Sequence, residues 1–311
     1  MHAMAPYSIR VYNPNLKGVR LEDRYALLDK VGQFDAYAVL RDHLLAQGEK
    51  FKLMEEDKQV YRYFGINAND QKREIAGWFE FGTYGVKNDI IDVETGVVDF
   101  EKTQKNAEIV RHYIRLYIPA GFNEGIALLH SFKGNGIKTV LYEQLRAHFH
   151  NVTKLNLQLN PLAYNKAFEL WKDAVAKEIK LVRFSGMGDI TDQIKRMGHD
   201  EHEQELIIKP PRRKSLGKLV DFFTPGTPEN ATVEVLMPLC SQLKTTVALN
   251  GKTRTFNIGR PATEQVCEVE VDEDDVAIIA GNPEPQSLHD WCTKVLGEFV
   301  QSIYPGMGVV K

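Results

Sequence analysis

The sequence predicts an α+β fold rich in strands, and two observations carry this prediction. Between residues 59 and 132, four segments are rich in aromatic and β-branched residues, a composition typical of strands. Segments with helical periodicity stand apart from these strands instead of alternating with them, which favours α+β over a doubly wound fold. The chain has 311 residues, 43% of them apolar and 26% charged, which is ordinary for one or two globular domains.

The N-terminal half is expected to contain a first strand and two helices. Residues 7–12 alternate between polar and apolar side chains, which indicates a strand, and Asn13-Pro14 ends it. Residues 35–47 carry apolar side chains at helical spacing, and Gly48 is a stop signal. A second helix is expected over residues 137–149, where the apolar residues again share one face.

The four strand-like segments lie between these two helices. The aromatic residues of the second segment fit core packing better than a platform for stacking bases, although both are compatible with the pattern. These aromatic residues are Trp78, Phe79, Phe81 and Tyr84. The four strands are expected at residues 59–66, 74–84, 108–119 and 124–132, with a turn at residues 94–96.

The C-terminal half mixes shorter elements. A helix with Phe168, Trp171 and Val175 in phase is expected to precede a strand over residues 177–184. The further expected elements are, in order, a turn and short helix at 186–197, a strand at 205–209, a loop at 224–230, and strands at 266–271 and 276–280.

Two features of this half have stronger signals. Asn250-Gly251 between two alternating stretches predicts a hairpin over residues 245–258 with a type I′ turn. Ser287 can cap a C-terminal helix that carries one apolar stripe. That stripe consists of Leu288, Trp291, Cys292, Val295 and Phe299.

The break at Asn160-Pro161 suggests where the chain divides. We expect a β-rich N-terminal domain over residues 1–155 with a few helices. A mixed α+β domain over residues 156–311 would contain the hairpin and the C-terminal helix.

Composition excludes several classes of protein. The formal net charge of −3 means that nucleic-acid binding would need a local patch. Three cysteines without a CxxC pair argue against a disulfide framework or a zinc ribbon. The apolar runs are too short to span a bilayer, so we expect a cytoplasmic protein without membrane insertion. No cofactor signature is evident.

The strongest candidate site is the basic stretch KPPRRKSLGK at residues 209–218. It holds five positive charges and no acid, a pattern typical of phosphate contact, and its two prolines would keep it extended. The candidate nucleic-acid-binding residues are Lys209, Arg212, Arg213, Lys214 and Lys218. A solvated loop is the commoner role of such a run. The acidic stretch 264–275, with seven negative charges, could neutralise it in the fold or between subunits.

Two weaker patterns could hold a metal ion. His199 and His202 stand among three carboxylates but are spaced i, i+3, unlike the i, i+4 pair of a zinc helix. Glu178 and Lys180 would share one face of a strand, as in the second half of a restriction-type nuclease signature, where the acid binds Mg²⁺. That signature needs a further upstream acid, for which Asp92 and Asp99 are distant alternatives.

The layout of two long segments resembles uncharacterised bacterial proteins encoded in anti-phage defence loci. These segments are EIAGWFEFGTYGVKNDIIDVETGVVDF, residues 74–100, and RLYIPAGFNEGIALLHSFKGNGIKTVLYEQLRAHF, residues 115–149. The resemblance covers much of the chain but includes no catalytic motif, so no functional residue is carried over from it. It implies a bacterial cytoplasmic protein that senses or acts on phage components, often beside a partner subunit.

Three hypotheses follow from the sequence. The first is a defence component that binds DNA or RNA through the basic stretch and acts with a partner protein. The second is a metal-dependent nuclease using Glu178 and Lys180, which alone would require Mg²⁺. The third is an interaction subunit that forms oligomers or docks a basic partner without binding nucleic acid.

Overall fold

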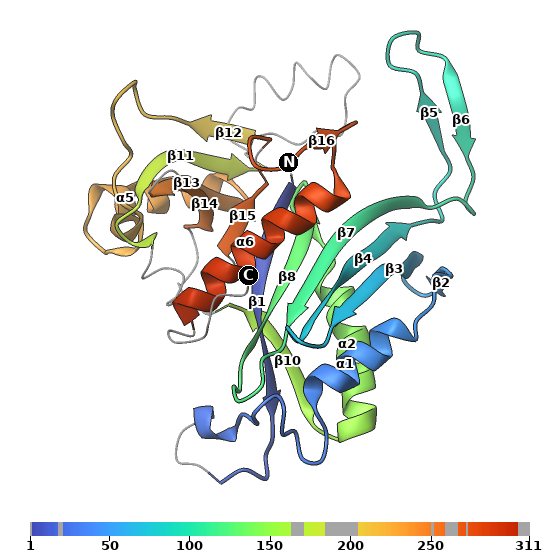
Figure 1. The fold of residues 1–311 in the computed structure, drawn as a ribbon. Coiled ribbons are helices and arrows are strands. Elements are labelled where there is room, and N and C mark those ends of the chain that lie inside the picture. The colour runs from blue at the N-terminus through green and yellow to red at the C-terminus, as the bar shows by residue number, and fades with distance from the viewer. Residues whose placement is uncertain are drawn as a thin grey trace. The chain divides into compact units, whose positions relative to one another are not determined.

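The fold is given by a computed structural model that describes residues 2–17, 21–162, 171–183, 205–249, 252–258, 267–271 and 273–303. The chain forms two compact units, one of residues 8–159 and one that combines residues 1–7 with 160–311. Strand β1 (His2–Tyr12) runs across the division between them. Both units combine strands with helices, so the predicted β-rich α+β class with a C-terminal helix is confirmed (Figure 1).

The unit of residues 8–159 is built on an antiparallel sheet in the order β1-β8-β7-β4-β3-β2. All four aromatic-rich segments form strands of this sheet, as predicted. Its strands beyond β1 are β2 (Lys52–Met54), β3 (Gln59–Asn69), β4 (Glu74–Thr83), β7 (Glu108–Tyr117) and β8 (Gly125–Phe132). The short β9 (Asn135–Gly136) pairs with β8, and β10 (Asn156–Pro161) pairs with β1.

Helices α1 (Ala36–Leu45) and α2 (Lys138–Thr153) pack against each other in this unit, and α1 also packs on β3 (Figure 1). The Tyr61 hydroxyl on β3 donates to Oε1 of Gln144 on α2 at 3.0 Å. Phe79 is fully buried between Tyr61 and Tyr63, as core packing requires, whereas Trp78 on the other face of β4 is half-buried. A short 3-10 helix, η1 (Leu21–Arg24), follows β1.

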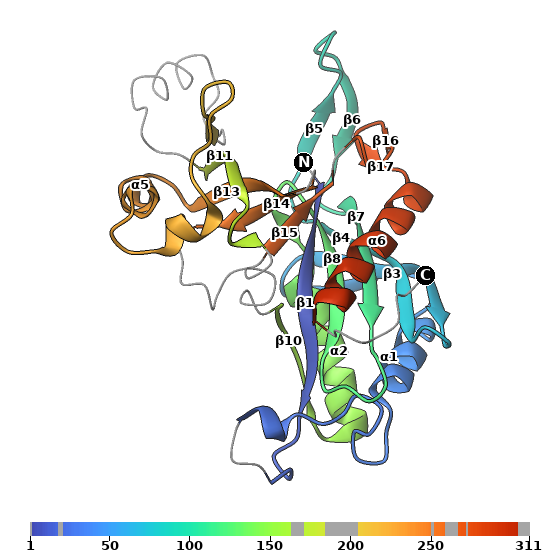
Figure 2. The same cartoon turned by 60° about the vertical axis from the view of Figure 1, so that its left-hand side comes forward.

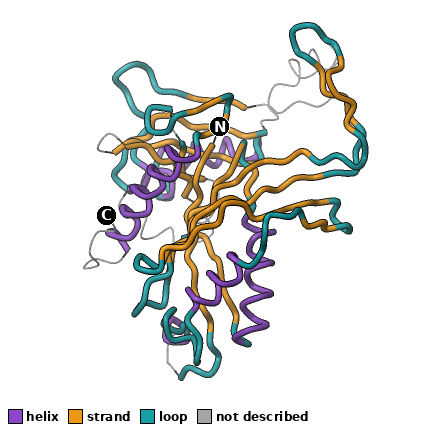
Figure 3. Tube along the Cα trace, turned by 45° about the vertical axis from the view of Figure 1, so that its right-hand side comes forward, coloured by secondary structure: helices purple, strands orange, loops and turns teal. Residues whose placement is uncertain are grey.

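A two-stranded hairpin connects β4 to β7 and projects away from that sheet (Figures 2 and 3). It consists of β5 (Asn88–Ile91) and β6 (Val98–Lys102), which pair antiparallel. The Asp92 carboxylate closes the tip by accepting from the backbone N–H groups of Glu94 and Thr95. The turn expected at residues 94–96 is therefore confirmed, and the two strands beside it are additional to the prediction.

The other unit contains a sheet in the order β12-β11-β13-β14-β15-β1. The strands are β11 (Val175–Val182), β12 (Glu205–Ile208), β13 (Gln242–Leu249), β14 (Lys252–Asn257) and β15 (Cys267–Glu270). Leu249 pairs with Lys252, which confirms the predicted hairpin, while Asn250-Gly251 lies outside the described residues.

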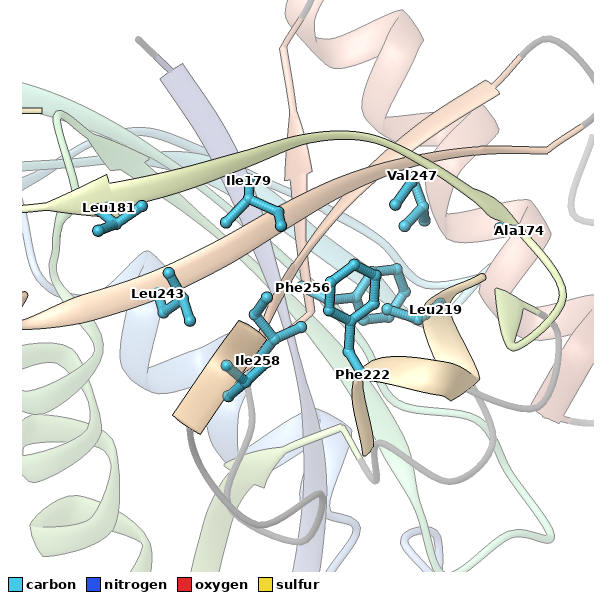
Figure 4. Packing of buried hydrophobic residues seen from close by; sticks show 11 residues of the cluster. Ala174, Ile179, Leu181, Leu219, Phe222, Leu243, Val247, Phe256 and Ile258 are labelled. Carbon is cyan, nitrogen blue, oxygen red and sulfur yellow. The ribbon is translucent and has the colours of Figure 1, made fainter. Parts of the chain in front are cut away.

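One face of this second sheet is apolar and packs on short helices. Phe256 and Leu243 from the sheet meet Leu219 and Phe222 of the 3-10 helix η2 (Leu219–Phe223) (Figure 4). Helix α5 (Pro228–Leu236) adds Val233 to the same core, and the 3-10 helix η3 (Met237–Leu239) follows it. The opposite face of the sheet is polar and carries the charged side chains discussed below.

The C-terminal helix α6 (Pro285–Ile303) belongs to this unit. All five residues of its predicted stripe are buried, so the periodicity argument is confirmed. The Arg254 guanidinium on β14 is 2.8 Å from Oε2 of Glu298, which links the helix to the sheet.

Three expected elements of this half are wrong in part. Val175 begins β11 instead of extending a helix from Trp171, and residues 163–170 lie outside the described part. Residues 224–230 are not a loop throughout, because α5 starts at Pro228 with the Thr227 hydroxyl accepting from the Asn230 N–H at 3.2 Å. The strand expected over 276–280 shrinks to β16 (Ile278–Ile279), which pairs with β17 (Asn282–Pro283).

Candidate nucleic-acid interface

The basic stretch forms a loop that is anchored to the sheet near both ends. It leaves the end of β12 at Lys209 and returns beside the start of β11. There the Ala176 N–H donates to the carbonyl oxygen of Gly217 at 2.9 Å, and the Leu216 N–H donates to the carbonyl oxygen of Ala176 at 3.2 Å. The loop is therefore held by the same strand that carries Glu178 and Lys180.

The middle of the loop is a tight turn, Pro211-Arg212-Arg213-Lys214, which we call the cationic turn. The Lys214 N–H donates to the carbonyl oxygen of Pro211 at 2.9 Å, which closes it. Arg213 has a φ of 67°, a left-handed conformation that favours glycine and costs a larger residue about 1 kcal/mol. Arg212, Arg213 and Lys214 are all exposed.

The two outer lysines of the stretch are engaged with carboxylates. Lys209 Nζ is 3.3 Å from Oε2 of Glu178, and Lys218 Nζ is 3.0 Å from Oδ1 of Asp173. The hydrogen bond between Asp173 and Lys218 raises the pKa of Lys218 and lowers the pKa of Asp173. The Asp173–Lys218 pair is exposed on both sides, so water and salt screen it strongly, whereas Glu178 is half-buried.

The three cations of the turn make no ion pair within the described part of the chain. Of the acidic stretch, Glu268 on β15 pairs with Lys244 on β13 of the same sheet at 2.7 Å, outside the basic stretch. Residues 264–266 and Asp272 of that stretch lie outside the described residues. Among the described residues, two of the five candidate residues are therefore paired with a carboxylate and three are not.

Glu178 and Lys180 share the polar face of β11, as the alternation predicts, because Ile179 and Leu181 face the apolar core. Lys180 is buried, and its Nζ is 2.8 Å from Oε2 of Glu205. Besides Lys209, Glu178 accepts from the Thr246 hydroxyl at 3.3 Å. Glu178 and Lys180 are therefore each neutralised by an oppositely charged side chain of the same unit.

Within the described ranges, no group of three His, Cys, Asp or Glu side chains could hold a metal ion. Of the upstream acids considered, Asp92 closes the tip of the β5–β6 hairpin, and Asp99 lies in β6. His199 and His202 fall outside the described residues.

The polar face of the second sheet extends beyond Glu178 and Lys180, the two residues that the sequence pattern indicates. Strand register places Lys244 opposite Lys180, and Thr246 opposite both Glu178 and Thr255. Tyr7 lies on β1, the strand next to β15 in this sheet. Burial and the nearby Glu268 carboxylate raise the pKa of Tyr7 to about 12. The signal was present in the alternation of β13, whose odd-numbered residues Leu243 and Val247 face the core.

None of the helices in the described residues is both long enough and apolar enough to cross a membrane. No protein-family model matches the chain. No curated protein matches its sequence either.

Proposed function

We propose that this protein binds nucleic acid through Arg212, Arg213 and Lys214, as a component of bacterial anti-phage defence that works in the cytoplasm with a partner protein. The observation that carries the binding proposal is the set of three adjacent, exposed cations on an anchored turn without an ion pair in the described part of the chain. The defence role rests on the resemblance of residues 74–100 and 115–149 to proteins of such loci.

The geometry of the turn sets the size of the contact. A β-turn brings its first and last Cα atoms within about 7 Å, so three charges occupy a space that two or three neighbouring phosphates of one strand would fill. Lys209 and Lys218 would add less because their carboxylate partners already neutralise them. We therefore expect weak binding without sequence preference, driven by counterion release.

The test is affinity for labelled duplex and single-stranded DNA and RNA across a range of salt concentrations. Three phosphate contacts predict a slope of log K against log salt of about −2.7 for a duplex and about −2.1 for a single strand. The double variant Arg212→Glu/Arg213→Glu should bind more weakly at low salt, with a slope smaller by about 2.

The matched control is Lys50→Glu/Lys105→Glu, which changes the net charge equally at exposed lysines of the other unit. It should retain most of the affinity and the wild-type slope. Equal losses in the two double variants would mean that only net charge matters, and unchanged affinity of the arginine variant would refute the proposal. Running the assay with Mg²⁺ also tests the nuclease alternative, since shortening of the probe that is lost in Glu178→Ala would favour it.

A further inference from the structure

The β5–β6 hairpin (residues 88–102), which we call the arm, exposes an unusual amount of apolar surface. Apolar pairs face each other across its strands, Ile90 with Phe100 and Ile91 with Val98. Six large apolar side chains of the arm are exposed, and Val93 at the tip is 91% exposed. The six are Ile90, Ile91, Val93, Val97, Val98 and Phe100. Exposed apolar side chains gathered on one short element mark a candidate interaction site.

The arm is also acidic. It carries five carboxylates and one lysine, Lys102, whose Nζ is 2.9 Å from Oε1 of Glu108. The carboxylates are Asp89, Asp92, Glu94, Asp99 and Glu101. A surface that binds the arm should therefore combine apolar groups with unpaired cations. Two arms would repel each other, so a symmetric arm-to-arm contact is disfavoured.

The chain itself carries a surface of that complementary kind. The cationic turn presents three exposed cations and the exposed Pro211, and Ile207 of β12, four residues before the turn in the chain, is also exposed. We propose that the arm of one copy docks on Ile207 and the cationic turn of a second copy. The contact joins two different surfaces, so it is heterologous, and it does not depend on nucleic-acid binding.

Two physical arguments support docking of the arm on the cationic turn of a second copy. A two-stranded hairpin alone is marginally stable in water, so burial of its apolar side chains would stabilise the arm itself. The carboxylates of the arm would also neutralise the three turn cations that lack a partner in the described part of the chain. The surface is small, so we expect a transient, salt-sensitive association with a micromolar Kd.

The experiment is analytical ultracentrifugation of the full chain, free of nucleic acid, at low and high salt. We expect the average mass to rise with concentration up to about 100 µM, and the association to weaken at high salt. Ile91→Thr/Val98→Thr, which keeps β-branched side chains in the hairpin, should remain monomeric. Val235→Thr removes an exposed apolar side chain from α5 and should associate like the wild type.

A charge exchange tests the pairing of the two surfaces. Asp89→Lys/Asp99→Lys and Arg212→Glu/Arg213→Glu should each be monomeric alone, whereas an equimolar mixture should associate. A wild type that stays monomeric at low salt, or an arm variant that associates normally, would overturn the proposal. Nucleic-acid affinity of Ile91→Thr/Val98→Thr separates the two proposals, since that variant should lose association and keep binding.

Discussion

Glu80 shows how a charged side chain is kept inside the unit of residues 8–159. Its side chain is 2% exposed, yet strand register places it directly between Arg62 on β3 and Arg111 on β7. Arg62 Nε lies 2.6 Å from one carboxylate oxygen and Arg111 Nε 2.8 Å from the other. The arginines stay partly in water, so burying the carboxylate costs less than burying a whole ion pair.

Replacing Glu80 with glutamine should destabilise this unit by about 2 kcal/mol, because two arginines lose their shared counter-charge and the hydrogen bond from Arg62 loses its charged acceptor. Urea unfolding followed by circular dichroism measures the change. Asp42→Asn, which removes an exposed carboxylate beside Arg41, is the control and should cost less than about 0.5 kcal/mol. A Glu80→Gln variant as stable as this control would contradict the argument.

His43 on α1 is a half-buried histidine whose pKa lies well below its ordinary value. Its ring stacks on His148 of α2 with the centroids 3.9 Å apart. Burial, followed by the positive charges of His148 and Lys52, lowers the pKa of His43 to about 4. The unfolded chain therefore binds a proton at His43 between about pH 6.5 and pH 4 that the folded chain does not, so stability falls as the pH drops through that range.

We expect protonation of His43 to lower the unfolding free energy at pH 5 by on the order of 1 kcal/mol relative to pH 7. This value is smaller than the full effect of the pKa shift because the ring is only partly buried and water screens its charge. That is a Tm difference of about 2–4 °C for a unit of this size. Between pH 7 and pH 5, the Tm of His43→Gln should fall less than the Tm of the wild type. His150→Gln, at an exposed position on α2, should keep the wild-type response, and an equal response in all three proteins would refute the assignment.

At the scale of elements, Gly82 lets β4 approach β7. A Cβ at this position would lie 1.9 Å from the carbonyl oxygen of Glu108 and 2.9 Å from Cδ1 of Ile109. Because the oxygen belongs to the paired backbone, it cannot move without breaking the ladder at the base of the arm. The absence of a side chain is thus a requirement of strand pairing at this position.

Gly82→Ala should lower the unfolding free energy by about 3 kcal/mol or more, at the upper end of overpacking effects. Gly136→Ala in β9 is the matched control, since its Cβ would meet only Ser131 Cβ at 3.7 Å and should change stability little. Urea midpoints of both variants measure the difference. Similar midpoints would mean that β4 and β7 can separate at little cost.

Local signals predicted elements well where one interaction dominates. The strands of residues 59–132 followed from aromatic and β-branched residues, and α6 followed from its apolar stripe. Helix α5 replaces part of the expected loop because Thr227-Pro228 starts a helix, although the proline and glycine at 225–226 favour a loop. The start of β11 was misplaced because Val175 suits both a helical stripe and a strand.

At the scale of the whole molecule, the charges are unevenly distributed. The chain has a net charge of −3, but the loop after β12 carries five cations and no acid, whereas the arm carries five acids and one lysine and residues 264–275 carry seven acids. Both proposals depend on this uneven distribution. Nucleic acid and a second copy would use the same three cations of the turn, so each would exclude the other.

The order of residues alone determined the fold class, most strands, the hairpin of β13 and β14 and the C-terminal helix, because each depends on periodicity or turn chemistry within a few residues. The same order located the five cations of the candidate interface. Tertiary structure decided which of these cations are available, since Glu178 and Asp173 reach Lys209 and Lys218 only through folding. It also brought Glu205 to Lys180 and left the apolar arm exposed, because pairing and burial depend on contacts between distant parts of the chain.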